Sequence, residues 1–332
     1  MAAQSFPEFS ARAPWVGPDL QTLRNVLRGP VLPPPRDCEQ EKLVLPLSDE
    51  SGDQLTASLC RPSPDSDRND APLVVLVHGL GGSEASSYID VTTTHLLSLG
   101  YPIVRLNLRG AGSSRPLCRN QYHAGRTRDF DDVLRALRSQ TSSTAGPTRN
   151  GIVAVGYSLG GNMLLKYAAE FGGLRAAISI SAPIDLAAAS NRFLDKRNLF
   201  YHRYLLNQIR AEALSASDGL SQRERALHPT LRSILEFDDL FVAPRNGFSD
   251  AADYYQKNSA RFFMNRIDLP ALVIHAKDDP WIPVRSYLEY PWNENTNLVP
   301  LLADSGGHVG FHDRGSRVPW HDRCLAEFLE RH

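Results

Sequence analysis

The pentapeptide Gly156-Tyr157-Ser158-Leu159-Gly160 is the most informative stretch of the sequence, because of the segments that flank it. The apolar residues 152–155 predict a short strand, and the pattern of residues 162–169 predicts a helix. A Gly-x-Ser-x-Gly motif between a strand and a helix is typical of a nucleophile elbow, in which small residues around the serine allow the chains to approach closely. The alternative is an ordinary glycine turn capped by a serine, so the rest of the chain must decide.

Working outward from this motif, short apolar strands alternate with helical stretches. Strands are predicted at 73–77, 103–106, 152–155, 176–180, 271–275 and 298–302, and helices at 85–99, 126–140 and 320–330. This alternation is typical of an α/β fold whose mostly parallel sheet is covered on both faces. Before it, residues 42–47 and 54–59 flank a polar turn and predict an antiparallel hairpin.

Three parts of the chain are predicted from these patterns. Residues 1–41 are rich in proline, with one short helix near 20–27, and are expected to form an arm packed on the core. The core is expected to comprise residues 42–184 and 268–332. The intervening residues 185–267 contain no convincing strand and are too long for a plain loop, so they predict a helical cap inserted over the carboxyl edge of the sheet.

Composition excludes several classes of protein. The 332 residues carry a net charge of -1 and no block of like charges, which argues against a nucleic-acid partner. The N-terminus has no signal-peptide pattern and no apolar run approaches a membrane span, so a soluble, cytoplasmic protein is expected. Cys38, Cys60, Cys118 and Cys324 show no C-x-x-C spacing, which argues against a thiolate metal site and a disulfide framework.

The residues of a catalytic triad follow three of the predicted strands in the order serine, acid, histidine. Ser158 follows the strand predicted at 152–155, Asp279 follows the one at 271–275, and His308 follows the one at 298–302. A serine hydroxyl needs a base to take its proton, and the base needs an acid to orient it. Asp278 competes for the acid position, but the turn Asp279-Pro280-Trp281-Ile282-Pro283 favours Asp279 and leaves Asp278 to bond backbone amides.

The glycine-rich segment 78–83 follows the strand 73–77 and predicts an oxyanion hole. Acyl transfer needs N–H donors already in place, and we assign them to the backbone amides of Leu80 and Leu159. The alternative of a phosphate-binding loop lacks its Lys-Ser/Thr pair. His78 is expected to brace this loop by hydrogen bonding, and Arg109 is expected to hold the loop after the strand 103–106.

Two further histidines, His312 and His321, are expected to be solvated. Five aromatic residues of the predicted cap could line an acyl pocket or form the core of the cap: Phe193, Phe200, Tyr204, Phe241 and Phe248.

Taken together, the sequence resembles the YheT-type branch of the α/β-hydrolase superfamily. The resemblance rests on His78-Gly79-Leu80-Gly81-Gly82-Ser83, Asn107-Leu108-Arg109-Gly110, Gly156-Tyr157-Ser158-Leu159-Gly160-Gly161-Asn162, Ala276-Lys277-Asp278-Asp279-Pro280, and the cap residues Phe237-Asp238-Asp239, Gly247-Phe248, Tyr254-Tyr255 and Ser259. The family's early His-Leu-Gln-Thr is replaced by Asp19-Leu20-Gln21-Thr22. The resemblance implies a serine carboxylesterase with the triad Ser158, Asp279 and His308.

These observations predict a carboxylic ester hydrolase that works through an acyl-enzyme on small to medium acyl esters, with no metal and no cofactor. An acyltransferase or a thioesterase could use the same acyl-enzyme. An inactive binding protein on the same scaffold is a third interpretation, although no triad member is lost. The sequence predicts neither the substrate-binding residues nor the oligomeric state.

Overall fold

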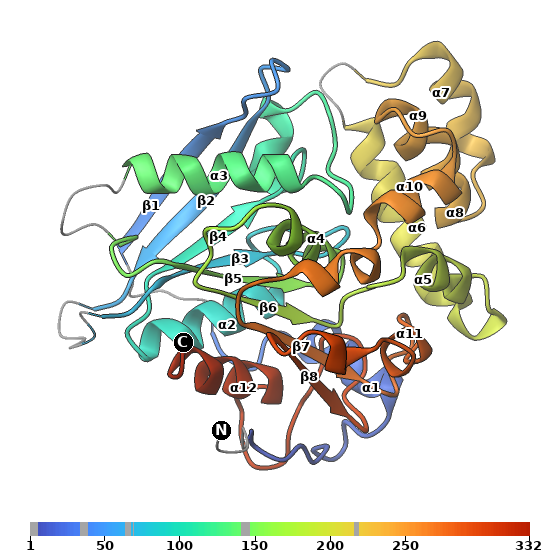
Figure 1. The fold of residues 1–332 in the computed structure, drawn as a ribbon. Helices are drawn as coiled ribbons and strands as arrows, with labels where there is room; N and C mark the ends of the chain where they lie inside the picture. Colours follow the sequence, from blue (N-terminus) through green and yellow to red (C-terminus); the bar gives the residue numbers. More distant parts are fainter. Residues whose placement is uncertain (1–5, 34–38, 64–67, 69, 141–146, 216–218) are drawn as a thin grey trace.

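One eight-stranded sheet organises the described part of the chain (Figure 1). The structure is a computed structural model and describes residues 6–33, 39–63, 68, 70–140, 147–215 and 219–332. The strands are β1 (Glu39–Pro46), β2 (Gln54–Arg61), β3 (Leu73–Val77), β4 (Ile103–Asn107), β5 (Ile152–Tyr157), β6 (Ala176–Ile180), β7 (Ala271–Ala276) and β8 (Leu298–Ala303). Their order is β1-β2-β4-β3-β5-β6-β7-β8. All pairs from β4 to β8 are parallel, which confirms the predicted α/β class.

The antiparallel pairs lie at one edge of the sheet. β1 pairs with β2, and β2 pairs with β4. The predicted hairpin is therefore confirmed, although β1 begins at Glu39, inside the segment that we expected to be an arm. The middle strands β3 to β7 are buried at every residue, which explains why they are mostly apolar and show no alternation.

Helices cover both faces of the sheet. Figure 1 shows α3 (Thr127–Gln140) and α4 (Leu159–Glu170) on one face, and α2 (Ser87–Ser98) and α12 (Trp320–Leu329) on the other. Parallel strands need crossover connections, and α2, α3 and α4 lie in three of them, whereas α12 follows β8. The arrangement sends β3, β5, β7 and β8 toward the same carboxyl edge.

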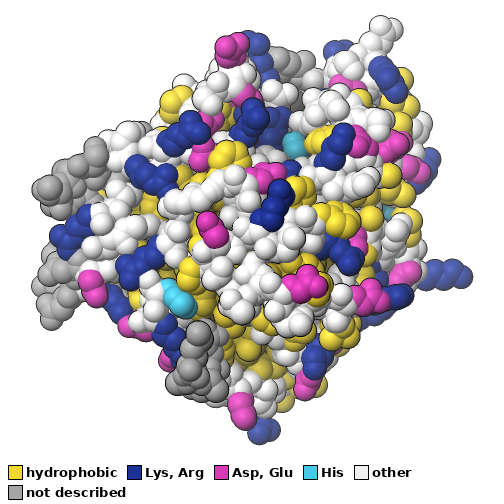
Figure 2. Space-filling view, in the orientation of Figure 1, with side chains coloured by type: hydrophobic (Ala, Val, Ile, Leu, Met, Phe, Trp, Pro, Cys, Tyr) yellow, Lys and Arg dark blue, Asp and Glu magenta, His cyan; other side chains and the backbone are white. Residues whose placement is uncertain are grey.

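The surface carries mixed charge. On the face shown in Figure 2, Lys and Arg side chains lie among Asp and Glu side chains. This mixture agrees with 36 Lys and Arg against 37 Asp and Glu in the whole chain. The face therefore presents no broad field of one sign that would attract a polyanion.

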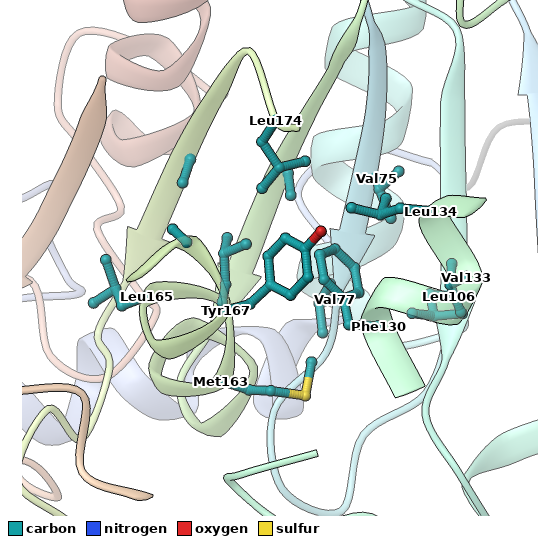
Figure 3. Packing of buried hydrophobic residues seen from close by; sticks show 14 of the residues in the cluster. Val75, Val77, Leu106, Phe130, Val133, Leu134, Met163, Leu165, Tyr167 and Leu174 are labelled. Atoms are coloured by element: carbon teal, nitrogen blue, oxygen red, sulfur yellow. The ribbon is translucent and has the colours of Figure 1, made fainter. Parts of the chain in front are cut away.

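The core between the sheet and the helices α3 and α4 is built from interlocking apolar side chains (Figure 3). Phe130 of α3 meets Tyr167 of α4 edge to face, with ring centroids 4.9 Å apart. Val75, Val77 and Leu106 of the sheet lie below these helices. Burial of each such side chain contributes about 1.5 to 3 kcal/mol, so this layer fixes the position of α4 and of the turn that begins it.

The segment between β6 and β7 is helical, and its described residues contain no strand. Its helices are α5 (Leu186–Phe193), α6 (Leu199–Leu214), α7 (Gln222–Leu227), α8 (Ile234–Phe237), α9 (Ala243–Arg245) and α10 (Ala251–Asn258), joined by short 3-10 and π turns. They share an apolar cluster of their own that includes Leu205, Ile209 and Phe241. The division of the chain into an arm, a core and a cap stays a prediction.

The N-terminal helix α1 (Pro18–Arg28) packs on a loop near the other end of the chain. Gln21 is fully buried, and its Nε2 donates to His312 O at 3.0 Å. The amide of His312 donates back to Gln21 Oε1 at 2.6 Å. These bonds join positions 291 residues apart, so α1 holds the loop that follows β8.

The expectation that His312 and His321 are solvated is wrong. Each is only 1% exposed, because α1 covers His312 and because α12 turns His321 toward the ring of Tyr157. None of their four ring nitrogens has a hydrogen-bond partner among the described residues. Burial, reinforced by neighbouring cationic and histidine side chains, lowers the pKa of each to about 3, so both are neutral.

Candidate active site

Ser158 occupies the sharp turn between β5 and α4. Its φ is 51° and its ψ is -122°, a conformation that costs energy for any residue with a side chain. The flanking glycines make the turn possible: a Cβ at Gly156 would lie 2.5 Å from Gly160 O, and one at Gly160 would lie 2.4 Å from His78 O. The motif glycines are therefore explained by close backbone approach.

Asp279 and His308 meet at the carboxyl ends of β7 and β8. His308 Nδ1 lies 2.8 Å from Asp279 Oδ2, and both residues are buried. The other oxygen, Oδ1, accepts from the amides of Trp281 at 2.8 Å and Ile282 at 3.0 Å. Burial alone would raise the pKa of Asp279, but the charge and hydrogen bond of His308 outweigh it and leave that pKa below its usual value. The carboxylate is thus ionised and fixed in orientation.

Three further contacts hold His308 in place. Asp278 Oδ1 accepts from the amide of Gly307 at 2.9 Å, so Asp278 bonds a backbone amide as expected, but across to the neighbouring loop. Thr22 Oγ1 of α1 accepts from the amide of His308 at 2.9 Å. The indole of Trp281 stacks on the imidazole, with ring centroids 4.3 Å apart. Segments from three distant parts of the sequence therefore position one ring.

The glycine-rich loop after β3 lies against Ser158. A Cβ at Gly79 would lie 3.0 Å from Ser158 Cβ. The amide of Gly79 donates to Tyr88 Oη at 3.0 Å, and that of Gly81 donates to Tyr122 Oη at 2.7 Å. The amide between them, that of Leu80, makes no hydrogen bond within the described structure. The two tyrosines hold the loop and leave the Leu80 N–H available.

His78 braces this loop from behind, as the sequence predicted. The amide of Leu108 donates to His78 Nε2 at 3.1 Å, which leaves the proton on Nδ1 to donate to Gly79 O at 2.8 Å. Complete burial lowers the pKa of His78 to about 4. The ring is therefore a neutral structural link between the loops that follow β3 and β4.

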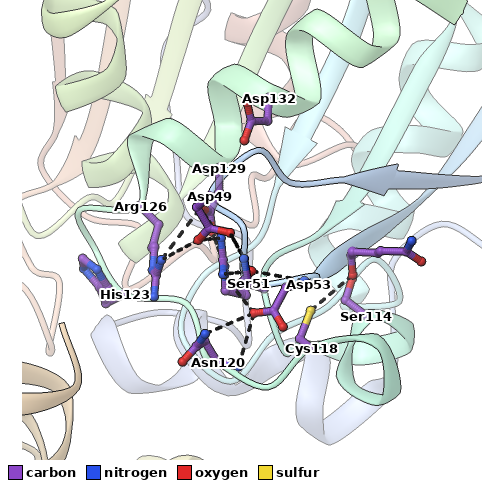
Figure 4. A network of polar contacts seen from close by, with 12 residues as sticks. Asp49, Ser51, Asp53, Ser114, Cys118, Asn120, His123, Arg126, Asp129 and Asp132 are labelled. Atoms are coloured by element: carbon purple, nitrogen blue, oxygen red, sulfur yellow. Dashed lines mark hydrogen bonds and ion pairs between the residues drawn. The ribbon is translucent and has the colours of Figure 1, made fainter.

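Arg109 is also structural. It is 1% exposed and forms ion pairs with three carboxylates, those of Asp49 at 2.7 Å, Asp53 at 2.9 Å and Asp129 at 2.7 Å. Figure 4 shows these carboxylates converging from the hairpin turn and from α3. Asp53 in turn accepts from the amide of Arg119 at 2.7 Å, so the network fixes the segment that carries Tyr122.

A cavity of about 830 Å³ brings the predicted site residues together. Ser158, His308, Leu80 and Leu159 all line it, whereas Asp279 lies behind His308. Four of the five cap aromatics also line it: Phe193, Phe200, Tyr204 and Phe241. Phe248 does not; it packs on His123 and Tyr254. Phe193 and Phe241 belong to the helical cluster as well, so the two roles of the cap aromatics coincide.

Several residues of the site were not found from the sequence. Tyr88 and Tyr122 hold the glycine-rich loop after β3, which lies against Ser158, and Thr22 holds the backbone of His308. Glu212 of α6 also lines the cavity, and burial raises its pKa to about 7. Only Thr22 carried a signal, since it lies in the Asp19-Leu20-Gln21-Thr22 segment.

No metal-binding arrangement of His, Cys, Asp and Glu side chains occurs among the residues that the structure describes. Three of the four cysteines, Cys60, Cys118 and Cys324, are buried, and Cys38 lies outside the described residues. No helix in the described ranges is long and apolar enough to span a bilayer.

Comparison with known proteins places these features in a family. The sequence model of the alpha/beta hydrolase fold matches residues 72–314. A protein of Escherichia coli (strain K12) named "Putative esterase YheT" is 37% identical over 246 residues, which are 72% of this chain and 70% of that protein. The "Medium-chain fatty acid ethyl ester synthase/esterase 2" of Saccharomyces cerevisiae is 28% identical over 79% of this chain but only 62% of its own length.

A solved structure agrees with the fold. The Pyrococcus furiosus esterase Pf2001 matches with a TM-score of 0.58, covering 98% of this chain and 99% of that chain. Its sequence is 17% identical, so this likeness supports the architecture of the sheet and helices.

Proposed function

This chain belongs to the YheT-type branch of the α/β-hydrolase family, and from that premise we propose that it hydrolyses carboxylic esters through an acyl-enzyme on Ser158. One observation carries the proposal. The His308–Asp279 pair, bonded at 2.8 Å, and the strained Ser158 turn face the same cavity. A base of fixed tautomer that faces the same cavity as a serine is what the activation of that serine requires.

The reaction divides into two halves. Ser158 Oγ attacks the ester carbonyl while His308 Nε2 takes the hydroxyl proton, and Asp279 stabilises the imidazolium that results. Collapse of the tetrahedral intermediate breaks the ester bond, and His308 returns the proton to the leaving alcohol. Water then attacks the acyl-enzyme with the same base, which releases the acid and restores Ser158.

The amides of Leu80 and Leu159 are the proposed donors to the oxyanion. Leu159 is the first residue of α4, where a backbone N–H has no partner within the helix. Leu80 lies between two amides that tyrosines already occupy. Two donors fixed before the reaction stabilise the developing charge without reorganisation, which is often the largest single contribution to catalysis.

The cavity is proposed to hold the acyl chain against Phe193, Phe241 and Trp281. Apolar walls favour an aliphatic acyl group over a charged one, because a charge would lose its hydration there. Every step uses groups of this chain and water, so the proposal includes no metal and no cofactor. A series of p-nitrophenyl esters from acetate to palmitate would measure the accepted length.

The central test is Ser158→Ala. Turnover of a short p-nitrophenyl ester should fall by about four to six orders of magnitude while the fold survives. Ser87→Ala is the matched control, because Ser87 also lines the cavity but has no proposed role. A fluorophosphonate probe should label the wild type and Ser87→Ala but not Ser158→Ala. Retention of most activity by Ser158→Ala would refute the mechanism, and an unlabelled wild type would favour an inactive binding protein.

Acyl transfer to an alcohol is the second candidate, because the yeast relative is named as both a synthase and an esterase. The alcohol would replace water in the second half of the reaction. Hydrolysis in water containing ethanol distinguishes the two: a transferase gives mostly ethyl ester, and a hydrolase gives mostly the free acid.

A further inference from the structure

Helix α1 presents its apolar residues to solvent. Its only buried residue is Gln21, whereas Leu20 is 42%, Val26 is 75% and Leu27 is 57% exposed. A surface helix of a globular protein normally turns its apolar side toward the core. In α1 the polar Gln21 is used to hold the His312 loop, and the apolar side faces outward.

The first turns of α6 continue this exposed surface. Leu199 is 59%, Phe200 is 85% and Tyr204 is 56% exposed, whereas Leu205 and Ile209 face the helical cluster. We call Leu20, Val26 and Leu27 of α1 together with Leu199, Phe200 and Tyr204 of α6 the mouth patch.

Direct contacts join the two helices. Asp19 Oδ2 accepts from the guanidinium of Arg197 at 3.0 Å, and Tyr201 Oη donates to Asp19 Oδ1 at 2.9 Å. Asp19 thus has a structural role, because it fixes α1 beside the start of α6.

The mouth patch opens into the cavity of the proposed active site. Val26, Phe200 and Tyr204 belong both to the patch and to the cavity lining. The same cavity is lined by Ser158 and His308. An apolar path therefore leads from the exposed side chains to the serine.

Positive charge predominates in the two segments that carry the patch. Residues 18–28 and 195–204 contain five Lys and Arg but only two Asp, of which Asp19 is paired with Arg197 and Asp195 with Arg192. Besides burial, the charges of Arg12, Arg28 and Arg317 lower the pKa of Arg24. Exposed apolar side chains ringed by cations are typical of surfaces that lie at the headgroup level of an anionic bilayer.

We propose that the mouth patch docks on bilayers that contain anionic phospholipid, so that the cavity takes its ester from the membrane surface. The apolar side chains of α1 and α6 enter the boundary between headgroups and acyl chains, and the surrounding cations meet the phosphates. The proposed ester hydrolysis gives a reason for a patch beside the cavity, but docking on the bilayer does not require that reaction.

Vesicle flotation tests the proposal on the intact chain carrying Ser158→Ala, so that turnover does not alter the lipid. The protein should float with vesicles of phosphatidylcholine and phosphatidylglycerol at 7:3, and much less with phosphatidylcholine alone. Raising the salt from 0.05 to 0.5 M should weaken the binding.

Two matched double variants sharpen the test. Leu27→Ser with Leu199→Ser removes two exposed side chains of the patch, 57% and 59% exposed, and should weaken vesicle binding at least about tenfold. Leu214→Ser with Leu288→Ser removes two that are 57% and 62% exposed but lie outside the patch, and should leave binding unchanged. None of these four leucines lines the cavity, so both pairs, made in the active wild type, should hydrolyse a water-soluble ester normally.

Several outcomes would overturn the proposal. These are no binding to the anionic vesicles, equal binding to phosphatidylcholine alone, or equal loss in the two double variants. A wild-type dimer that the patch variants convert to a monomer would show instead that the patch is an interface between copies of this chain. Because binding is measured without turnover, failure of the proposed ester hydrolysis would leave its result intact.

Discussion

His308 and His312 lie four residues apart in the loop after β8, and both are buried, yet their surroundings differ completely. His308 bonds Asp279 and faces the cavity. His312 has no partner for either ring nitrogen, and cations of the N-terminal segment lie near it. The comparison teaches that one loop can place two buried histidines in different settings: burial and nearby cations lower the pKa of His312, whereas a carboxylate lies in position to orient the ring of His308.

The largest effect is expected when His308 loses its carboxylate partner Asp279 and so lacks a partner, as His312 does among the described residues. Asp279→Asn should lower kcat by about four orders of magnitude with little change in KM, because asparagine neither selects the tautomer nor stabilises the imidazolium. Asp278→Asn is the control, because the Asp278 carboxylate accepts a hydrogen bond from the backbone amide of Gly307 and does not bond His308. It should retain activity within about tenfold, and an equal loss in both variants would contradict the assignment of the acid.

The next effect concerns helix α1, which contacts the backbone of both histidines. Gln21→Leu removes the partner of both the amide and the carbonyl of His312, and should lower the free energy of unfolding by about 2 to 3 kcal/mol. Asn25→Leu on the same helix should change it by less than about 0.5 kcal/mol, because Asn25 is not part of that contact. Urea unfolding measures both, and equal stabilities would argue against the bracing role of α1.

The third prediction uses pH to separate the histidines. The pKa of His312 is about 3 in the folded chain against an ordinary value of 6.5, so between these values only the unfolded chain binds the proton. The contribution of His312 to stability is complete above about pH 6.5 and is lost as the pH falls. Relative to His312→Leu, the wild type should lose about 1.6 kcal/mol between pH 6.5 and pH 5. Parallel stability curves for the two proteins would exclude this assignment.

The smallest effect is expected at Thr22, which holds the amide of His308. Thr22→Val removes that acceptor and should lower kcat about threefold, because the imidazole is less well placed. Thr22→Ser keeps the hydroxyl and should restore the rate. A loss that serine does not restore would indicate that the methyl group of Thr22 matters more than its hydrogen bond.

Much of the fold could be predicted because local sequence patterns indicate its strands and helices. The mostly apolar runs of β3 to β7 and the helix after Ser158 need no distant partner to be recognised. The structure also puts Asp279, and not Asp278, 2.8 Å from His308, as the turn pattern suggested. The catalytic roles of these residues stay predictions.

The rest depends on contacts between distant segments, which no local pattern contains. His312 is buried because Gln21, 291 residues earlier, packs on its backbone. Tyr88 and Tyr122 are ordinary in sequence, and their role appears only where their hydroxyls meet Gly79 and Gly81. In α1, Leu20 and Leu27 are exposed because the buried position of the helix belongs to Gln21, which only its contact with the distant His312 loop explains.

The pairing of α1 with the loop after β8 has a consequence for the biogenesis of this protein. The helix leaves the ribosome about 290 residues before the loop on which it docks. At about 5 to 20 residues per second, the helix must wait roughly 15 to 60 s with its binding face vacant. The histidine loop is thus completed only when this later segment has been translated and has packed on α1.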